Sequence, residues 1–202
     1  MQALSIIALG DVHAEELMPL GEKFNRLEQL VLDINPRHPL SEHRAEFNRA
    51  VDAASADWIL VVRERESVTA ALAHEIGAVT DTARAWGFRI RVQPFYGGAP
   101  LLLGTGEGEV RLLHKRHYMR FAEKGEWPEP VIQGTIVRLG NAFHAETFPT
   151  VAEHLAYLQR TAVPHSSLRR ILLFARNALG TKTLDRNTLR YIWTEAGYDK
   201  SS

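Results

Sequence analysis

The chain contains no cysteine, and this absence excludes a disulfide-stapled scaffold, thiolate metal sites and a cysteine nucleophile. It also has no net charge, because 24 lysine and arginine residues balance 24 aspartate and glutamate residues, and its pI is about 7.2. No overall positive field is present to gather phosphate backbones. Nucleic acid is therefore not an expected partner.

Long apolar runs are missing as well, since no stretch approaches the roughly 20 residues that a membrane span needs. Residues 1–9 carry no basic start, and their apolar run ends at Gly10 and Asp11, so we expect no targeting segment. Any membrane contact should be peripheral, and a cytoplasmic location is the simplest expectation. With 202 residues, 45% of them hydrophobic, the chain can bury the core of one domain.

Short apolar runs alternate with helical patterns in the first part of the chain. Strand-like runs lie at 3–9, 27–33 and 58–62, and helical spacing occurs at about 14–24, 41–54 and 67–87. In the last helix the predicted apolar stripe runs from Val68 to Trp86, with Ser67 as the N-cap and Gly87 at the end. This βαβαβα order predicts an α/β fold with a mostly parallel sheet, whose ligands bind beyond the carboxyl ends of the strands.

After residue 87 the pattern changes to short strand-like pieces separated by glycine and proline, which predicts an antiparallel extension of the sheet. These pieces lie at 88–96, 101–103, 110–113 and 131–139. From residue 150 onward, helical segments predict a helical tail. Since there is no internal repeat or low-complexity linker, we expect one domain over residues 1–162 and a tail over residues 163–202 packed on it.

Several motifs follow one another in a fixed order. Asp33 ends the second strand, Asn48 lies on the next helix, and Ala56-Asp57-Trp58-Ile59-Leu60 leads into the third strand. Residues 66–76, 109–115 and 144–160 continue the order. Over most of residues 1–162 the chain resembles the family 2 glycosyltransferases, and it is similar to bacterial transferases of the lipopolysaccharide core. The resemblance implies a GT-A fold, a mixed sheet flanked by helices with a Rossmann-like half that binds nucleotides.

The same resemblance implies a function. It implies transfer of a hexose from a nucleotide sugar to a glycan or lipid acceptor of the cell envelope. In this interpretation Asp33 binds the nucleoside, while Asn48 and Asp57 support that edge of the site. Nucleotide sugar and acceptor are thus the expected partners.

The family's metal motif is altered in this chain. Where the family has two metal-binding aspartates, this sequence has Arg63-Glu64-Arg65-Glu66. A divalent ion needs anionic oxygen ligands and is repelled by arginine, so we expect no metal and no other cofactor. One hypothesis is a metal-independent transferase in which Arg63 or Arg65 neutralises the leaving diphosphate, with Glu66 completing the catalytic set. The alternative is an inactive module that binds a ligand or protein without transferring sugar.

The family's catalytic base has no clear counterpart, and Glu126 and Glu129 are the candidates. A third hypothesis starts from Gly10-Asp11-Val12-His13, a turn of the kind that presents metal ligands in dinuclear metallophosphoesterases. The further ligands that such an enzyme needs are missing from the sequence. In the tail, basic residues beside apolar ones over residues 167–179 predict a helix that packs on the sheet or lies peripherally on anionic lipid.

Overall fold

The computed structural model describes residues 2–33, 43–82, 84–96, 98–101, 107–122 and 129–148. They belong to two compact units, Met1–Val92 with Gly106–His144, and Gln93–Thr105 with Ala145–Ser202. The predicted boundary at residue 162 and the helical tail lie outside the described residues. Within the described ranges, no helix is long and apolar enough to cross a membrane.

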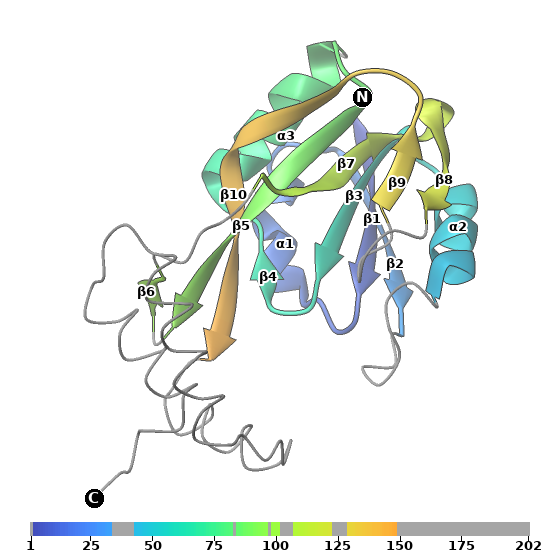
Figure 1. The fold of residues 1–202 in the computed structure, drawn as a ribbon. Helices are drawn as coiled ribbons and strands as arrows, with labels where there is room; N and C mark the ends of the chain where they lie inside the picture. Colours follow the sequence, from blue (N-terminus) through green and yellow to red (C-terminus); the bar gives the residue numbers. More distant parts are fainter. Residues whose placement is uncertain are drawn as a thin grey trace, which may run out of the picture. The chain divides into compact units, whose positions relative to one another are not determined.

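Three βα pairs open the chain, as the alternating pattern predicts (Figure 1). They are β1 (Ala3–Leu9), α1 (Ala14–Gly21), β2 (Arg26–Leu32), α2 (Arg44–Ala53), β3 (Trp58–Arg63) and α3 (Ala70–Thr82), with the two-residue strand β4 (Glu66–Ser67) before α3. The later strands are β5 (Gly87–Tyr96), β6 (Ala99–Pro100), β7 (Glu109–His114), β8 (Tyr118–Ala122), β9 (Glu129–Ile132) and β10 (Ile136–Phe148). A short 3-10 helix, Lys115–His117, joins β7 to β8.

The main sheet is mixed. Strand β1 pairs in parallel with both β2 and β3, so the arrowheads of these strands point the same way in Figure 1. Strand β7 then pairs antiparallel with β3 and β5, giving the order β2-β1-β3-β7-β5-β10-β4, with β6 beside β5. The predicted α/β class is therefore confirmed, and the sheet flanked by helices is consistent with a GT-A-like arrangement.

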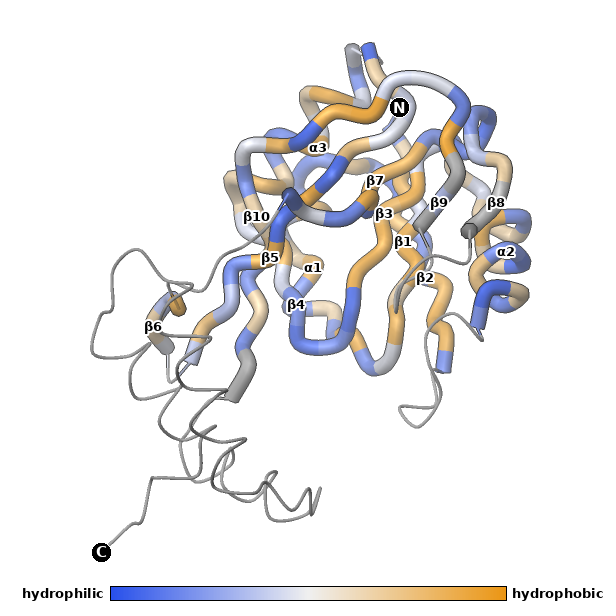
Figure 2. The backbone as a smooth tube through the Cα atoms, viewed as in Figure 1, coloured by the Kyte–Doolittle hydropathy of each residue, from blue (hydrophilic) through white to orange (hydrophobic). Residues whose placement is uncertain are grey.

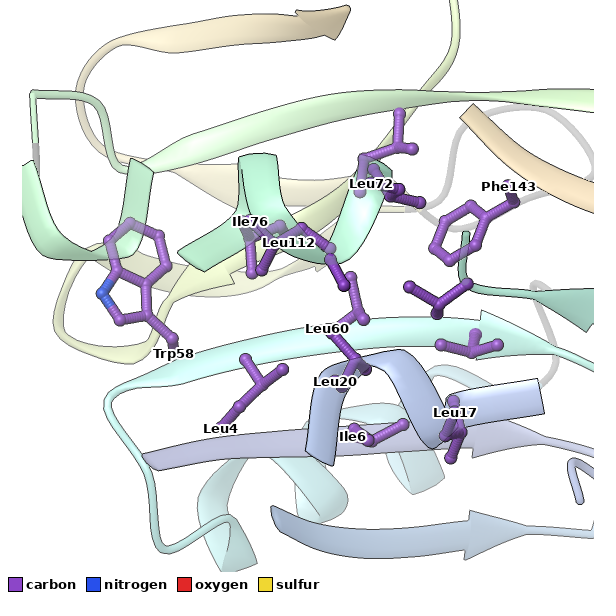
Figure 3. Packing of buried hydrophobic residues seen from close by; sticks show 14 of the residues in the cluster. Leu4, Ile6, Leu17, Leu20, Trp58, Leu60, Leu72, Ile76, Leu112 and Phe143 are labelled. Atoms are coloured by element: carbon purple, nitrogen blue, oxygen red, sulfur yellow. The ribbon is translucent and has the colours of Figure 1, made fainter. Parts of the chain in front are cut away.

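Both faces of the central strands are buried, which explains their continuous apolar sequences. On β1, Leu4, Ile6 and Ala8 face α1 and α3, whereas Ile7 and Leu9 face α2. Figure 3 shows Leu17 and Leu20 of α1 beside Leu4 and Ile6 in the first of these clusters, and Leu72 and Ile76 as the contribution of α3. In Figure 2 the central strands are hydrophobic, and the turn between β3 and β4 is hydrophilic.

The helix predicted over 67–87 is shorter than its apolar stripe. Ser67 lies in β4, and the side chain of Thr69 accepts the Leu72 N–H instead (3.1 Å), as an N-cap does. The helix ends at Thr82, and Trp86 lies outside it, because its N–H donates to the Thr135 carbonyl (3.0 Å) next to β5. The prediction of a helix to residue 87 is wrong because strand pairing outweighs the helical spacing.

The strand predicted over 131–139 is two strands, since β9 ends at Ile132 and β10 begins at Ile136. Gly134 has φ +129° in the turn between them, and a Cβ there would overlap Cδ1 of Trp86. The chain reverses at this point, and β9 pairs antiparallel with β8 in a separate two-stranded sheet that the sequence pattern did not predict.

In the second unit, the end of β5 pairs antiparallel with β6. Phe95 faces Pro100 and Tyr96 faces Ala99 across the two strands. The Leu101 N–H closes the hairpin by donating to the Pro94 carbonyl (2.8 Å). Of the strand predicted at 101–103, residues 102 and 103 lie outside the described residues.

Candidate functional site

The carboxyl ends of β1, β2 and β3 meet at one edge of the sheet, which we call the carboxyl edge. It carries Gly10 after β1, Asp33 after β2 and the turn at Glu64 after β3. Two backbone hydrogen bonds join these segments, from the Gly10 N–H to the Leu32 carbonyl (3.0 Å) and from the Glu64 N–H to the Leu9 carbonyl (2.8 Å). Since open α/β sheets bind ligands beyond this end of the strands, the candidate site lies here.

A buried arginine contacts the Arg63–Glu66 segment. The side chain of Arg111, on β7, has no exposed surface, and that of Glu66 is 5% exposed. The two guanidinium Nη atoms of Arg111 donate to the two carboxylate oxygens of Glu66, at 3.0 Å and 3.3 Å. This bidentate pairing satisfies both charges where water is excluded. Glu66 therefore serves as the counter-ion of Arg111.

A second ion pair continues this network toward the surface. One oxygen of Glu109 accepts from both Arg63 Nη2 (2.6 Å) and Arg111 Nε (3.0 Å). The Arg63 N–H donates to Glu66 Oε2 (2.9 Å), which ties the strand end to the same carboxylate. Burial, followed by the neighbouring Arg111, lowers the pKa of Arg63, while Glu109 and Glu66 oppose that shift. Two cations and two anions thus form an internally neutral network next to the Arg63–Glu66 segment.

Arg65 has an unusual backbone conformation. Among the non-glycine residues that the structure describes, Arg65 is the one with a positive φ, at +65°. Its side chain is 58% exposed. Its Nε lies 3.7 Å from Glu64 Oε1 in the same turn. Residues other than glycine and asparagine rarely adopt this backbone conformation. Such strain occurs preferentially at functional sites. Arg65 is thus an exposed cation held at the carboxyl edge.

The other predicted site residues are spread along the sheet. Asp33 is exposed at the carboxyl edge. Asn48 lies midway along α2 and accepts a hydrogen bond from the Tyr118 hydroxyl. Asp57 precedes β3 at the opposite end of that strand, where Arg116 Nε lies 3.4 Å from its Oδ1. The structure thus brings Asp33, the Arg63–Glu66 segment and Gly10 to one edge and places Asp57 at the other.

Sequence reasoning did not single out Glu109 or Arg111 as site residues. A signal was present, because Arg111 interrupts the apolar run Val110 to Leu113 of a strand that is buried on both faces. A charge in such a position requires an ion partner. Glu109 is two residues from Arg111, and residues i and i+2 share one face of a strand. The sequence therefore indicates Glu109 as a partner of Arg111.

The phosphoesterase hypothesis requires a cluster of metal ligands. Within the ranges that the structure describes, no group of three or more histidine, aspartate or glutamate side chains is placed to hold an ion. Asp11 Oδ1 and His13 Nδ1 are 3.8 Å apart and strongly exposed. Of the two candidates for a catalytic base, Glu126 and the side chain of Glu129 lie outside the described residues.

The amino edge of the same strands carries an aromatic cluster instead. His117 stacks on Trp86 with 3.8 Å between ring centroids, and His114 meets the edges of Trp58 (4.9 Å) and Trp86 (5.3 Å). Burial lowers the pKa of His114, Asp57 opposes this shift, and His117 and Arg116 add to it. Folding therefore shifts the protonation equilibrium of His114 toward the neutral imidazole, relative to the unfolded chain.

This preference predicts a pH dependence of stability. Because the folded pKa of His114 lies below its unfolded value of about 6.5, the unfolded chain binds the proton more readily. The free energy of unfolding should be fully retained above pH 6.5 or so and should decrease as the pH falls below it. Urea titrations followed by tryptophan fluorescence at several pH values measure this slope. His114→Gln should flatten the slope, whereas His74→Gln, at an exposed position on α3, should leave it unchanged; equal slopes in all three proteins would contradict the prediction.

The likeness of this chain to known proteins is confined to solved structures. No family model matches it, and no curated protein does. Crystal structures of S. aureus TarS are similar to it: one of residues 1–349 in complex with UDP-GlcNAc has a TM-score of 0.43 at 12% identity, covering 98% of this chain and 71% of that one. Another, in complex with UDP, has a TM-score of 0.41 at 12% identity, covering 98% and 70%. Since these TM-scores are below 0.5, the proposals below rest on the residues of this chain.

Proposed function

We propose that this chain is a glycosyltransferase-like protein that binds a nucleotide sugar at the carboxyl edge without a divalent ion. The hexose passes to a glycan or lipid acceptor of the cell envelope. The sequence resemblance over residues 1–162 supports the substrate class. The position of Asp33 and Arg65 at one edge of a mixed α/β sheet supports the site.

The neutral ion-pair network is the observation that carries the metal-free part of the proposal. An ion needs carboxylate oxygens with room to coordinate, and both oxygens of Glu66 and Oε2 of Glu109 already accept from guanidinium groups. We assign Arg65 to the leaving diphosphate, because its exposed guanidinium can present several donors to phosphate oxygens. The guanidinium of Arg63 is paired with Glu109. We assign Asp33 to the nucleoside.

A second candidate function is a module that binds the nucleotide sugar without turning it over. The observation that favours it is the state of Glu66, whose two oxygens both accept hydrogen bonds from Arg111. A carboxylate held in this way is a poor general base for an acceptor hydroxyl. Both candidates share the same binding site, and they differ in turnover.

Calorimetric titration tests the binding site. UDP-GlcNAc, UDP, GDP and CMP are titrated with manganese and again with EDTA, and binding of one of them should persist in EDTA. Arg65→Ala should weaken that binding by about tenfold or more, because a charge-assisted hydrogen bond is worth roughly 1.5–3 kcal/mol. Arg49→Ala is the matched control, since Arg49 is an exposed arginine on α2 paired with Glu46. Loss of binding in EDTA, or an equal effect of both variants, would contradict the metal-free site.

Turnover separates the two candidates. The protein that binds is incubated with the nucleotide sugar and a panel of cell-envelope glycans and lipids, and release of the nucleoside diphosphate is followed. Release that depends on the acceptor supports the transferase. Intact binding without release supports the module. Metal-dependent hydrolysis of simple phosphate esters that is lost in Asp11→Ala would support the phosphoesterase instead.

A further inference from the structure

Strand β2 ends the sheet, since β1 is its neighbour in the sheet order of the described residues. Its register with β1 runs without a bulge from Ala3 opposite Arg26 to Leu9 opposite Leu32. The strand contains no proline and no lysine. Natural sheets use bulges, prolines and charges, above all lysine, to keep edge strands from pairing with other chains. These protections are weak in β2.

Exposed apolar side chains lie along this edge. Val31 is 61% exposed and Leu27 is 36% exposed. Because alternate residues share a face, these two lie on one face of β2 with Gln29 between them. Glu28, the acidic residue of β2, does not lie between these side chains. Its Oε2 accepts from Ser5 Oγ (2.6 Å) and from the Ser55 N–H (2.7 Å). The exposed face of β2 is thus uncharged between Leu27 and Val31, and the Gln29 amide between them donates to the Val12 carbonyl (3.0 Å).

The backbone directions fix which groups point outward. The Leu32 carbonyl accepts from the Gly10 N–H, so the backbone of Leu32 faces β1. Backbone groups alternate in direction along a strand, and those of Leu27, Gln29 and Val31 therefore point away from β1. The residues with exposed apolar side chains also present the N–H and carbonyl groups of the edge.

We propose that β2 is the contact through which two copies of this chain associate, with the two β2 strands antiparallel and Gln29 at the centre. A strand centred on Gln29 is self-complementary, since Leu27 of one copy lies opposite Val31 of the other and Gln29 faces Gln29. Each of these positions is a hydrogen-bonded pair of the antiparallel ladder. Apolar residues directly opposite each other stabilise such a ladder. A two-fold contact of this kind closes on itself and gives a dimer.

Sedimentation velocity over a wide concentration series tests the association. The wild-type chain should shift reversibly from monomer to dimer, with weak affinity, because a single strand pair is small for an interface. Val31→Lys should weaken dimerisation by about tenfold or more. Val137→Lys, at a valine of β10 that is 45% exposed, should dimerise like the wild type. A monomer throughout the series, or equal dimerisation of both lysine variants and the wild type, would overturn the proposal.

The register is tested by disulfide cross-linking, for which a chain without cysteine is a clean background. Gln29→Cys should form a dimer on oxidation, because the Cα atoms of a hydrogen-bonded pair are about 5.5 Å apart, within the range of a disulfide. Leu27→Cys should not, since the same register separates the two Leu27 positions by about 13 Å, four residues along the strand. Equal cross-linking of the two variants would overturn the antiparallel register.

Discussion

Replacement of Glu66 by alanine should destabilise the fold by roughly 3–5 kcal/mol, the usual effect of removing one partner of a buried ion pair. The reason is that Arg111, with no exposed surface, would keep its charge and lose both carboxylate oxygens. The Arg63 N–H would lose its acceptor as well. The melting temperature should fall by about 10 °C, because each kcal/mol corresponds to roughly 2–4 °C in a chain of this size. Differential scanning calorimetry measures the change.

The matched control removes both charges. Glu66→Leu combined with Arg111→Met leaves no unpaired charge in the interior, and apolar replacement of a buried ion pair is often close to neutral. The double variant should therefore melt well above Glu66→Ala. If Glu66→Ala melted like the wild type, the pairing with Arg111 would not be needed for stability, and the neutral network would lose its structural role.

Gly108→Ala should be the second strongly destabilising change. Gly108 has φ +80°, and a Cβ at this position would lie 2.8 Å from the backbone C and O of Ile90 in β5. The left-handed backbone alone costs an alanine about 1–2 kcal/mol, and displacing a packed strand adds roughly 1–3 kcal/mol. A total loss of about 2–5 kcal/mol should appear in urea unfolding. Glu109 follows Gly108, so the change should also loosen the acceptor that holds Arg63.

Gly98→Ala isolates the contribution of the close approach. Gly98 has nearly the same φ, +76°, but among the described residues a Cβ there would meet no atom within 4 Å. This variant should lose only the backbone part, about 1–2 kcal/mol. Equal losses in the two variants would show that the approach to Ile90 has no energetic weight.

The parallel part of the fold could be predicted because its signal is local. Runs such as Trp58 to Val62 are apolar on both faces, and only a strand covered on both sides of a sheet buries them completely. Strand β4 could not be predicted, since two residues show no periodicity. The end of α3 was misjudged because Trp86 fits the helical spacing, while its backbone pairs with a residue far along the chain.

The position of the candidate site at the carboxyl edge could be predicted from the sequence, whereas the long-range ion pairs within it could not. Asp33 and the Arg63–Glu66 segment follow strands, and strand order alone brings them to one edge. The pairing of Arg111 with Glu66 joins residues 45 positions apart, and no local pattern encodes which acid an interior arginine will meet. The same holds for the stacking of His117 on Trp86, which depends on two turns.

The buried guanidinium of Arg111 has a consequence for how this site can change. It lies between the carboxylates of Glu66 and Glu109 and supplies positive charge to both from within the chain. Aspartates introduced at positions 63 and 65 would meet a place already occupied by a tethered cation. Loss of Arg111 alone would leave the buried carboxylate of Glu66 without its bidentate partner, whereas Glu109 would keep its ion pair with Arg63. The charges of Arg111 and Glu66 are therefore interdependent, so the two positions tolerate a joint apolar replacement better than a single one.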